Sequence, residues 1–482
     1  MSASQIITVE ERFNASYDDV LLHALSGHQF TYGQFLKYAL TISTTWGELG
    51  VTRGDKVALI LPNSPAVLAC YLACIFGGFT AVPINPDLNQ KDQNRLLQMT
   101  HPTLVVSDPP VYVEQSGATN QKILPPPDNR DVPVAIMCTS GTTGEPKGIC
   151  VQLNRLIGSA QSFSRIANMN QQTRMYHVLP MFYNAGLLNA FLAPVMAGGT
   201  IIEGPQFSLL TMLDFWKRPK DCFANFLCVT PTIATALCHL ARTGDGITNI
   251  EHVFQNIISS GNILNDKTRS IFRQTFGVSL QDCYGVTELG GPLTLQTKVD
   301  AETRDDAGYI LPGVEYELRE VFDNSFELWV KSPYMMYGYL DGTNISLPTD
   351  DRGYMSTEDL AEIKDNRLQI IGRIKDVIIR GGENIFPSII ESELCNVPGV
   401  KEVAVIGEPH EFWGESTTAC ILPEENVDHD SIIIDIRNHA ARNMSSLYRP
   451  DRLVVIKDFP RSAIGKVQKK LLRSRLSKYI VH

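Results

Sequence analysis

The sequence predicts an α/β protein with a large N-terminal domain of parallel-type αβ subdomains plus a β-rich subdomain, and a small α+β C-terminal domain. Three observations predict this fold. Strand-like apolar runs alternate with helical stretches through most of the first 300 residues, which is typical of a largely parallel sheet. Around residues 308–370 the strands become shorter and turns more frequent. A chain of 482 residues is also too long for one compact core, so at least two domains are expected.

The expected elements of the large domain follow in chain order. Residues 32–49 are helix-like, and residues 57–84 predict a buried strand–helix–strand unit. The charge-free stretch 64–85 is long enough to cross a bilayer, but its proline and glycine residues argue against a membrane span. Further apolar strands are expected at residues 104–106, 132–138, 200–202 and 257–261. Strands of the β-rich subdomain are expected at residues 316–318, 327–331 and 367–371.

A second, smaller unit is expected near the C-terminal end. Helical patterns and strand-like runs alternate there, at residues 387–396, 403–406, 431–442 and 453–456. This mixture predicts an α+β domain of its own. The predicted domains are therefore residues 1–374 and residues 375–482, with a boundary that pattern alone places only to within a few residues.

Composition and charge restrict the class of protein. Hydrophobic residues make up 44% and charged residues 20% of the chain, as in ordinary soluble globular proteins. The net charge of −10 argues against nonspecific nucleic-acid binding, which requires a basic surface. Ten cysteines lie without paired spacing, and the first residues lack a signal-peptide pattern, so reduced thiols and a cytoplasmic location are expected. These patterns leave the oligomeric state open.

The most informative motif is residues 139–148, which read TSGTTGEPKG. Three glycines, four hydroxyl side chains and a lysine follow an apolar strand. Glycine lets backbone N–H groups turn toward an anion, hydroxyls donate further hydrogen bonds, and lysine adds a positive charge. The run therefore predicts a polyphosphate-binding loop, with a flexible surface turn as the alternative. It is not a Walker A loop, because Gly144 is followed by Glu145 and Pro146.

Four more motifs carry groups suited to a nucleotide. Residues 284–288 (YGVTE) combine a ring that can stack on a base with a carboxylate that can hold Mg²⁺. Within residues 353–359, Asp359 can accept two hydrogen bonds from ribose hydroxyls. The alternative for residues 284–288 is a polar turn at a strand end, and the alternative for residues 353–359 is a capped turn. The last two motifs are residues 372–376 with residues 381–384, and residues 460–466.

Together and in this order, the five motifs resemble the adenylate-forming superfamily, which includes acyl- and aryl-CoA synthetases, peptide-synthetase adenylation domains and luciferases. The resemblance extends from Thr31 to Lys466, nearly the whole chain. It implies an AMP-binding large domain, a small mobile lid domain and a hinge at Lys375. It also implies ATP and Mg²⁺ as ligands and a small carboxylic acid as substrate. The reaction it implies has two steps and passes through an acyl-adenylate.

The resemblance implies a role for individual residues of these motifs. Lys466 is expected to reach the attacking carboxylate and the α-phosphate, Glu288 to bind Mg²⁺, and Thr287 to contact phosphate. The residues expected to bind ATP or AMP are Thr139, Ser140, Gly141, Thr142, Thr143, Gly144, Lys147, Gly261, Asn262, Tyr284, Gly285, Asp359 and Arg373. Within that set, the glycine-rich loop is expected to bind the β- and γ-phosphates, Tyr284 to lie beside adenine, and Asp359 to bind the ribose.

The resemblance favours coenzyme A as the thiol acceptor. Residues 378–387 and 400–409 most resemble the acyl- and aryl-CoA synthetase branch, in which Gly381, Gly382 and Glu383 lie at the thiol tunnel. The alternative is the phosphopantetheine thiol of an acyl-carrier protein supplied in trans, because the sequence carries no carrier-protein signature. A luciferase-like oxygenase and a non-catalytic acyl- or nucleotide-binding protein are further alternatives, and the intact motifs disfavour the latter.

The identity of the acid is left open. Tyr183, Asn184 and Gly186 resemble the block at the acyl pocket, where CoA ligases commonly have histidine in place of Tyr183. No aspartate is placed to bind an ammonium group, which disfavours an amino acid; fatty, aryl and short branched acids remain. The departures from the family pattern are Asn154, Asn262, residues 325–327, and Glu358 in place of the usual glycine before Asp359.

Overall fold

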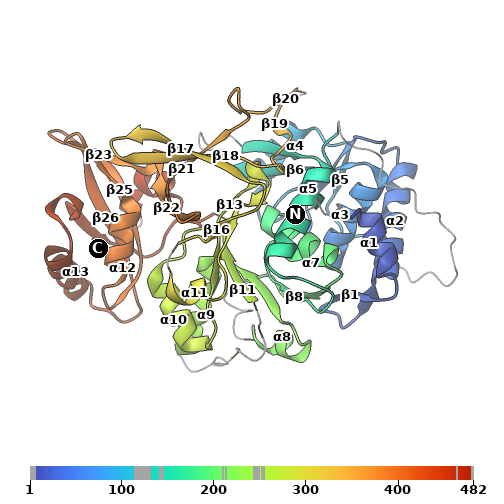
Figure 1. Ribbon diagram of the computed structural model, residues 1–482, viewed down its shortest axis with the longest axis horizontal. Coiled ribbons are helices and arrows are strands. Elements are labelled where there is room, and N and C mark those ends of the chain that lie inside the picture. The colour runs from blue at the N-terminus through green and yellow to red at the C-terminus, as the bar shows by residue number, and fades with distance from the viewer. Residues whose placement is uncertain are drawn as a thin grey trace.

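The computed structural model describes residues 7–112, 132–140, 146–208, 211, 214–242, 250, 254, 256–304, 306–342, 344–462 and 465–478. Figure 1 shows a large body on the right and, on the left, a small body formed by the C-terminal part of the chain. Three sheets of six or seven strands build the large body, and one sheet of five strands builds the small body. This arrangement confirms the predicted α/β class with a large N-terminal and a small C-terminal domain.

The first sheet has the strand order β12–β11–β10–β8–β9–β1–β2. Its strands are β1 (Val20–His23), β2 (Gln29–Thr31), β8 (Arg174–His177), β9 (Thr200–Glu203), β10 (Phe226–Val229), β11 (Asn256–Ser260) and β12 (Gln281–Cys283). Neighbouring strands are parallel except β1 with β2, and β8 to β12 are almost fully buried, as parallel strands covered by helices are. The segments that leave their carboxyl ends therefore meet at one edge.

The second sheet has the order β20–β19–β7–β6–β4–β3–β5. Its strands are β3 (Lys56–Leu59), β4 (Thr80–Pro83), β5 (Leu104–Val106), β6 (Ala135–Ser140), β7 (Pro146–Val151), β19 (Gly338–Asp341) and β20 (Asn344–Ser346). The half from β5 to β6 is parallel, and the half from β6 to β20 is antiparallel. The predicted phosphate loop connects β6 to β7, where the two halves join.

The third sheet is antiparallel, with the order β15–β16–β22–β21–β18–β17. Its strands are β15 (Thr294–Leu295), β16 (Tyr309–Ile310), β17 (Glu315–Phe322), β18 (Ser325–Lys331), β21 (Met355–Lys364) and β22 (Arg367–Arg373). A separate short ribbon pairs β13 (Gly285–Val286) with β14 (Gly291–Pro292). This is the predicted β-rich subdomain, and in Figure 1 its long strands extend toward the small body.

The small body is built on the sheet order β24–β23–β26–β25, with β27 parallel to β26. Its strands are β23 (Ile378–Arg380), β24 (Glu383–Ile385), β25 (Val400–His410), β26 (Gly414–Pro423) and β27 (Arg452–Val455). Among the described residues, no buried hydrophobic cluster contains residues of both bodies. Each body therefore has its own core, and the boundary at residue 375 stays a prediction.

The helices begin and end at residues suited to those positions. Before α2, Thr31 and Gln34 cap each other, since each side chain accepts a hydrogen bond from the other residue's N–H. The helices of the large body are α1 (Val9–Ala15), α2 (Tyr32–Glu48), α3 (Pro65–Gly77), α4 (Gln90–Thr100), α5 (Leu153–Ile166), α6 (Asn184–Leu187), α7 (Ala193–Met196), α8 (Lys217–Asp221), α9 (Pro231–Arg242), α10 (Asp266–Phe276) and α11 (Asp300–Thr303). Those of the small body are α12 (Pro387–Cys395), α13 (His429–Asn443) and α14 (Lys469–Ser474).

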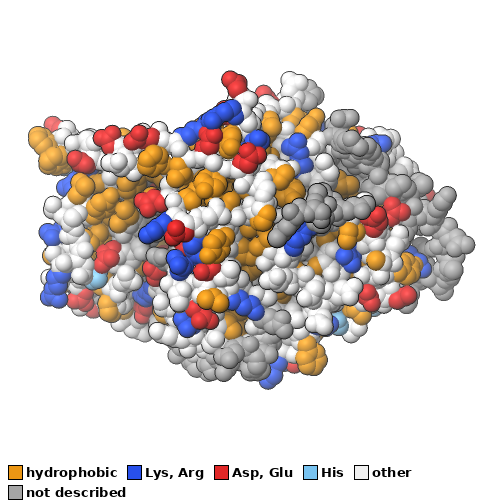
Figure 2. Space-filling view, viewed as in Figure 1, with side chains coloured by type: hydrophobic (Ala, Val, Ile, Leu, Met, Phe, Trp, Pro, Cys, Tyr) orange, Lys and Arg blue, Asp and Glu red, His pale blue; other side chains and the backbone are white. Residues whose placement is uncertain are grey.

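The charge-free stretch 64–85 forms α3 and β4 of a buried unit inside the large body. Of the helices in the described ranges, none is both long and apolar enough to cross a bilayer. All ten cysteines are described, and none forms a disulfide. On the face shown in Figure 2, acidic and basic side chains lie interspersed rather than gathered by sign.

Several strands are longer than the sequence pattern indicates. β25 begins at Val400 and continues to His410, whereas a strand was expected only at residues 403–406. β17 likewise extends to Phe322, through alternating charged residues. Both strands pair along their length with an antiparallel neighbour, so backbone hydrogen bonds extend them through polar residues that carry no apolar signal.

Candidate active site

The candidate site lies at the carboxyl edge of the first sheet. β11 ends at Ser260 and leads into Gly261 and Asn262, and β12 ends at Cys283 and leads into Tyr284. Ser260 is paired with Cys283 in parallel register, so the segments that leave the two strands are adjacent. Gly261 has φ +93°, a left-handed conformation that glycine adopts without strain, and Asn262 beside it is exposed.

A buried carboxylate, Asp359, lies at the centre of the site, 2% exposed. Its Oδ2 accepts a hydrogen bond of 2.7 Å from the Tyr284 hydroxyl, and its Oδ1 lies 2.9 Å from Nε of Arg373. Asp359 and Arg373 are directly opposite each other in the β21–β22 hairpin, which brings the third and fourth motifs together. Burial raises the pKa of Asp359, and the charge of Arg373 opposes that rise. A carboxylate has about four acceptor positions, so some remain for a ligand.

Lys466 belongs to the small body but lies close to the Asp359–Arg373 pair. Burial lowers the pKa of Lys466 to about 8; the charge of Arg373 adds to this effect and that of Asp359 opposes it. The preceding Gly465 has φ +81°, and its carbonyl accepts a hydrogen bond of 3.4 Å from Thr232 Oγ1. A Cβ at position 465 would lie 2.8 Å from Oγ1 of Thr232, so the close approach of this loop to α9 requires glycine.

Glu288 lies in a single 3₁₀ turn, Thr287–Leu289. Its Oε1 accepts a hydrogen bond of 3.0 Å from the Tyr339 hydroxyl, and its carbonyl oxygen accepts one of 2.8 Å from the Met336 N–H. The Lys147 ammonium lies 4.7 Å from the centre of the Tyr339 ring, within the range of a cation–π interaction. Tyr339 therefore connects the predicted Mg²⁺ ligand to the predicted phosphate-loop lysine.

The donor set around Glu288 fits a Mg²⁺ ion that shares its ligands with a nucleotide. Mg²⁺ usually binds one or two carboxylates together with substrate phosphates rather than a closed protein cage. Within the described ranges, no group of three or more His, Cys, Asp or Glu side chains could hold a metal alone. The Tyr339 hydrogen bond orients the Glu288 carboxylate, as the outer partners of metal ligands commonly do.

The predicted phosphate loop is only partly within the described residues. β6 and β7 form an antiparallel hairpin in which Thr139 is opposite Lys147 and Ser140 is opposite Pro146. The tip of this hairpin and the two side chains at the end of β6 lie outside the described residues, namely Gly141, Thr142, Thr143, Gly144 and the side chains of Thr139 and Ser140. Their contact with phosphate stays a prediction.

Gly285 and Glu358 have special backbone positions beside the site. A Cβ at position 285 would lie 2.5 Å from the carbonyl oxygen of Gly291, so the β13–β14 ribbon requires glycine there. Glu358 has φ +58°, a conformation that residues with a side chain rarely adopt. A glycine, which the motif resemblance implies at this position, would adopt it freely. The exposed Glu358 adopts this conformation directly before Asp359.

The three predicted acyl-pocket residues lie at the start of α6. Gly186 is buried, and its carbonyl lies 3.0 Å from Nε2 of the buried His177. A Cβ at position 186 would lie 2.2 Å from the Pro180 carbonyl oxygen, so Gly186 is required for packing. Tyr183 and Asn184 are half-buried, and burial raises the pKa of Tyr183. The helix continues directly into a π-helical segment, Leu188–Leu192, a feature frequent at functional sites.

A small cavity lies between the acyl-pocket segment and the phosphate-contact segment. Asn184 and Thr287 both line it, together with Arg155 of α5. Nη1 of Arg155 donates hydrogen bonds to the carbonyls of Met335 and Met336, at 2.8 and 2.7 Å. The cavity therefore places a predicted acyl-pocket residue next to a predicted phosphate contact.

The predicted thiol-tunnel residues lie away from this site in the arrangement described. Gly381, Gly382 and Glu383 form the exposed turn between β23 and β24, where both glycines have positive φ. A Cβ at position 381 would lie 2.8 Å from the Trp413 ring. Figure 1 shows β23 at the outer end of the small body, well separated from β13. The structure therefore does not bring the turn to Asp359.

Lys375 lies in the short 3₁₀ turn Ile374–Asp376 that joins β22 to β23. The turn is the connection between the two bodies, and Ser388 of α12 donates a hydrogen bond to the Ile371 carbonyl beside it. Burial lowers the pKa of Lys375, and the charge of Arg373 adds to this effect. The position fits the predicted hinge.

The sequence did not single out Tyr339 or Thr232. Tyr339 reaches the phosphate loop because β19 pairs with β7, with Tyr339 opposite Ile149. Thr232 lies in the first turn of α9, after the carboxyl end of β10, and is 233 residues before its partner Gly465. Both are ordinary residue types outside any glycine-rich or charged motif, so only the pairing of distant segments reveals them.

Known proteins share both parts of this architecture. Residues 9–340 match the AMP-binding enzyme family, and residues 389–466 match the AMP-binding enzyme C-terminal domain. The chain belongs to the AMP-binding enzyme family. The resemblance of the five motifs to adenylate-forming enzymes is thereby confirmed.

Individual relatives are similar in sequence to nearly the whole chain. A long-chain-fatty-acid–CoA ligase of Mycobacterium tuberculosis is 27% identical over 486 residues, which covers 93% of each chain. A sulfoacetate–CoA ligase of Cupriavidus necator is 27% identical over 485 residues, again 93% of each chain. Among solved structures, ATP-bound MatB of Rhodopseudomonas palustris superposes with a TM-score of 0.83 at 24% identity, over 98% of this chain and 99% of that one. These similarities support the fold and leave the acid open.

Proposed function

We propose that this chain is an AMP-forming acid–thiol ligase that joins a small carboxylic acid to coenzyme A. In the first step, a carboxylate oxygen attacks the α-phosphorus of ATP, the bond to the bridging oxygen breaks, and pyrophosphate leaves. In the second step, the thiol sulfur of coenzyme A attacks the acyl carbon, the thiol proton is lost, and AMP leaves. The products are a thioester, AMP and pyrophosphate.

The observation that carries this proposal is the position of Lys466. The residue before it, Gly465, contacts Thr232 of the large domain, and the charges of Asp359 and Arg373 act on Lys466. A cation there can stabilise the charge that develops on the α-phosphoryl oxygens, and it positions the attacking carboxylate. Such a site is complete only when the small domain is docked against the large one.

The other site residues are assigned by their chemistry. Asp359 would accept the ribose hydroxyls, Tyr284 would pack beside the base, and Arg373 would contact ribose or phosphate. Lys147 and the loop before it would bind the β- and γ-phosphates. Glu288 would hold Mg²⁺ against the phosphates, where the ion neutralises their charge. Tyr183 and Asn184 would face the acid.

The second half-reaction requires a different arrangement of the two domains. Gly381 and Gly382 would line the path of the thiol, but both are exposed in this arrangement. A rotation about Lys375 would withdraw Lys466 and present this turn to the acyl-adenylate. We therefore place the domain boundary at the hinge, between residues 374 and 375.

The first experiment is pyrophosphate release from Mg-ATP across a panel of fatty, aryl, short branched and sulfonated short-chain acids, with and without coenzyme A. The products are identified by mass. Acid-dependent release that rises with coenzyme A and yields an acyl-CoA supports the proposal and names the acid. Release with accumulation of adenylate, unaffected by coenzyme A, would assign the acceptor to a carrier protein instead. No release with any acid would contradict the proposal for these substrate classes.

A further inference from the structure

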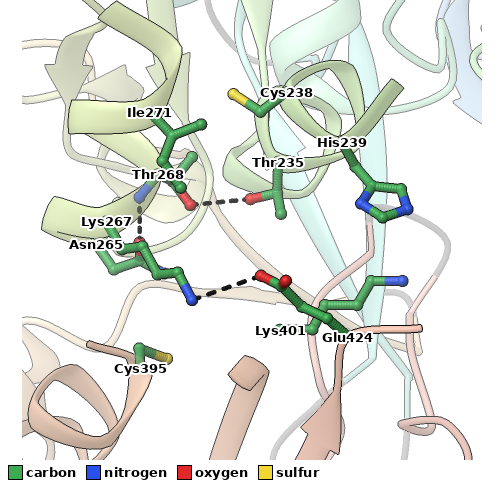
Figure 3. A pocket seen from close by; sticks show the side chains of 10 residues that line it. All are labelled: Thr235, Cys238, His239, Asn265, Lys267, Thr268, Ile271, Cys395, Lys401 and Glu424. Atoms are coloured by element: carbon green, nitrogen blue, oxygen red, sulfur yellow. Dashed lines mark hydrogen bonds and ion pairs between the residues drawn. The ribbon is translucent and has the colours of Figure 1, made fainter. Parts of the chain in front are cut away.

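The two domains also meet at a second interface, beside the nucleotide site. A cavity lies between α9 and α10 of the large domain and the facing edge of the small domain (Figure 3). Its large-domain wall includes Thr235 and Lys267, and its small-domain wall includes Cys395, Lys401 and Glu424. Figure 3 shows Lys267 of the large domain and Glu424 of the small domain pointing toward each other.

Lys267 crosses this interface. Its Nζ donates a hydrogen bond of 2.5 Å to the Val400 carbonyl and lies 3.8 Å from Oε1 of Glu424. Both partners belong to the small domain, whereas Lys267 is in the first turn of α10. The lysine side chain is 23% exposed, so its hydrogen bond is partly shielded from water. Shielding strengthens a hydrogen bond that involves a charged donor.

The same pair of helices also receives the loop that carries Lys466. Thr232, in the first turn of α9, donates its hydrogen bond to Gly465, directly before that lysine. The hydroxyls of Thr235 on α9 and Thr268 on α10 lie 3.0 Å apart and join the two helices. The helix pair α9–α10 therefore contacts the small domain at two separate points.

We propose that Lys267 is a positioning residue that holds the small domain in the adenylate-forming arrangement. The inference rests on the proposed function for its catalytic consequence. A rotation that brings Gly381 and Gly382 to the site has to separate Lys267 from Val400 and Glu424, because the partners lie on opposite domains. Loss of the lysine therefore favours the undocked small domain and withdraws Lys466.

The direct test measures docking and needs no acid. In the full-length, ligand-free protein, Lys267→Met keeps most of the aliphatic stem and removes the charged donor. Cys395 lines the cavity and also packs in the core of the small domain. Its alkylation by N-ethylmaleimide, followed by peptide mass spectrometry, therefore reports undocking when Cys420, which is fully buried elsewhere in the same domain, does not label faster. We expect the variant to label at Cys395 about 10-fold faster, the order of effect of one charged hydrogen bond.

Two controls make the result specific. Cys70 and Cys74 are fully buried in α3 and should label at the wild-type rate, because the large domain stays folded. Lys401→Met removes a lysine that lines the same cavity without a hydrogen bond or ion pair among the described residues, and it should label like the wild type. Unchanged labelling of Cys395 in Lys267→Met, or an equal rise at Cys70, Cys74 or Cys420, would overturn the proposal.

The catalytic consequence is tested on each half-reaction. With an acid identified by pyrophosphate release, Lys267→Met should slow adenylate formation about 10-fold. It should leave thioester formation from preformed acyl-adenylate and coenzyme A within about twofold of wild type. Equal loss in both steps would assign Lys267 a merely structural role and overturn the proposal. Absence of any acid-dependent release by wild type would count against the ligase assignment, while Cys395 labelling would still decide the docking role.

Discussion

At the scale of single residues, the site gathers three cations around one buried carboxylate. Arg373, Lys466 and Lys375 all act on Asp359, and each charge opposes the rise in its pKa that burial causes. This local group of cations can attract an anionic ligand. It occurs in a chain whose net charge is −10, because the charge that recognises phosphate is local.

The first prediction concerns Lys466 and pH. Burial lowers the pKa of its ammonium to about 8, so the group is protonated below that pH and neutral above it. We expect kcat/KM for ATP in adenylate formation to fall as pH rises through about 8, because kcat/KM reports the free enzyme. Lys466→Arg should move the fall to higher pH, since arginine stays charged. A wild-type profile that stays flat up to about pH 9.5 would contradict this assignment.

The second prediction concerns Tyr339. Tyr339→Phe removes the hydroxyl that donates to Glu288 but keeps the ring beneath Lys147. We expect the Mg²⁺ concentration for half-maximal pyrophosphate release to rise about 10-fold, the order of effect of losing an outer-shell partner. Tyr339→Leu should raise it further, because the cation–π contact is lost as well. An unchanged Mg²⁺ titration in both variants would rule out this positioning role.

At the scale of elements, the β21–β22 hairpin assembles the centre of the site. Its register places Asp359 opposite Arg373. On the other side of β21, the Thr357 hydroxyl donates a hydrogen bond to the Leu328 carbonyl of β18. Glu358 turns through a left-handed conformation inside β21. The strand therefore stores local strain next to the residue that it positions.

The third prediction tests this strain. Glu358→Gly should leave the free energy of unfolding within about 1 kcal/mol of wild type, because relief of the left-handed conformation offsets the entropy lost by glycine. Glu358→Val should lower it by about 1–2 kcal/mol, since a β-branched residue fits that conformation worst. Denaturant unfolding of the variants measures both.

The matched control lies on the same strand. Glu362 is also exposed, but it is not among the residues with positive φ. Glu362→Val should therefore be close to neutral, because β-branched residues suit a strand. Equal destabilisation by valine at both positions would show that the backbone conformation of Glu358 is not the cause.

At the scale of the whole molecule, the described arrangement serves one half-reaction. Lys466 enters the site and Gly465 contacts Thr232, while Gly381 and Gly382 remain on the outer surface. A ligase that uses both Lys466 and these glycines therefore has to move the domain as a body.

The fourth prediction follows from this division of roles. Lys466→Ala should slow adenylate formation by about 10²–10³-fold, as loss of a charge stabilising the transition state does. Thioester formation from preformed acyl-adenylate should be largely retained, because the lysine is withdrawn in that step. Lys457→Ala, at an exposed position of the small domain, is the control. Equal loss of both half-reactions would contradict the two-arrangement mechanism.

The sequence alone determined the α/β class, the family and the residues of the nucleotide motifs. A short motif that combines glycines, hydroxyls and charged groups can be recognised without knowledge of the fold. The motifs themselves therefore point to Tyr284, Asp359, Arg373 and Lys466. The tertiary structure brings these four together from both domains. Their individual roles in catalysis stay predictions.

Only the tertiary structure decided how distant segments meet. The contacts of Tyr339, Thr232 and Lys267 join residues far apart in the chain, and each is an ordinary residue type outside the nucleotide motifs. Position 186 requires glycine because the Pro180 carbonyl oxygen leaves no room for a Cβ there. The docked position of the small domain likewise depends on hydrogen bonds across an interface, and such bonds leave no periodic or compositional pattern in the sequence that forms them.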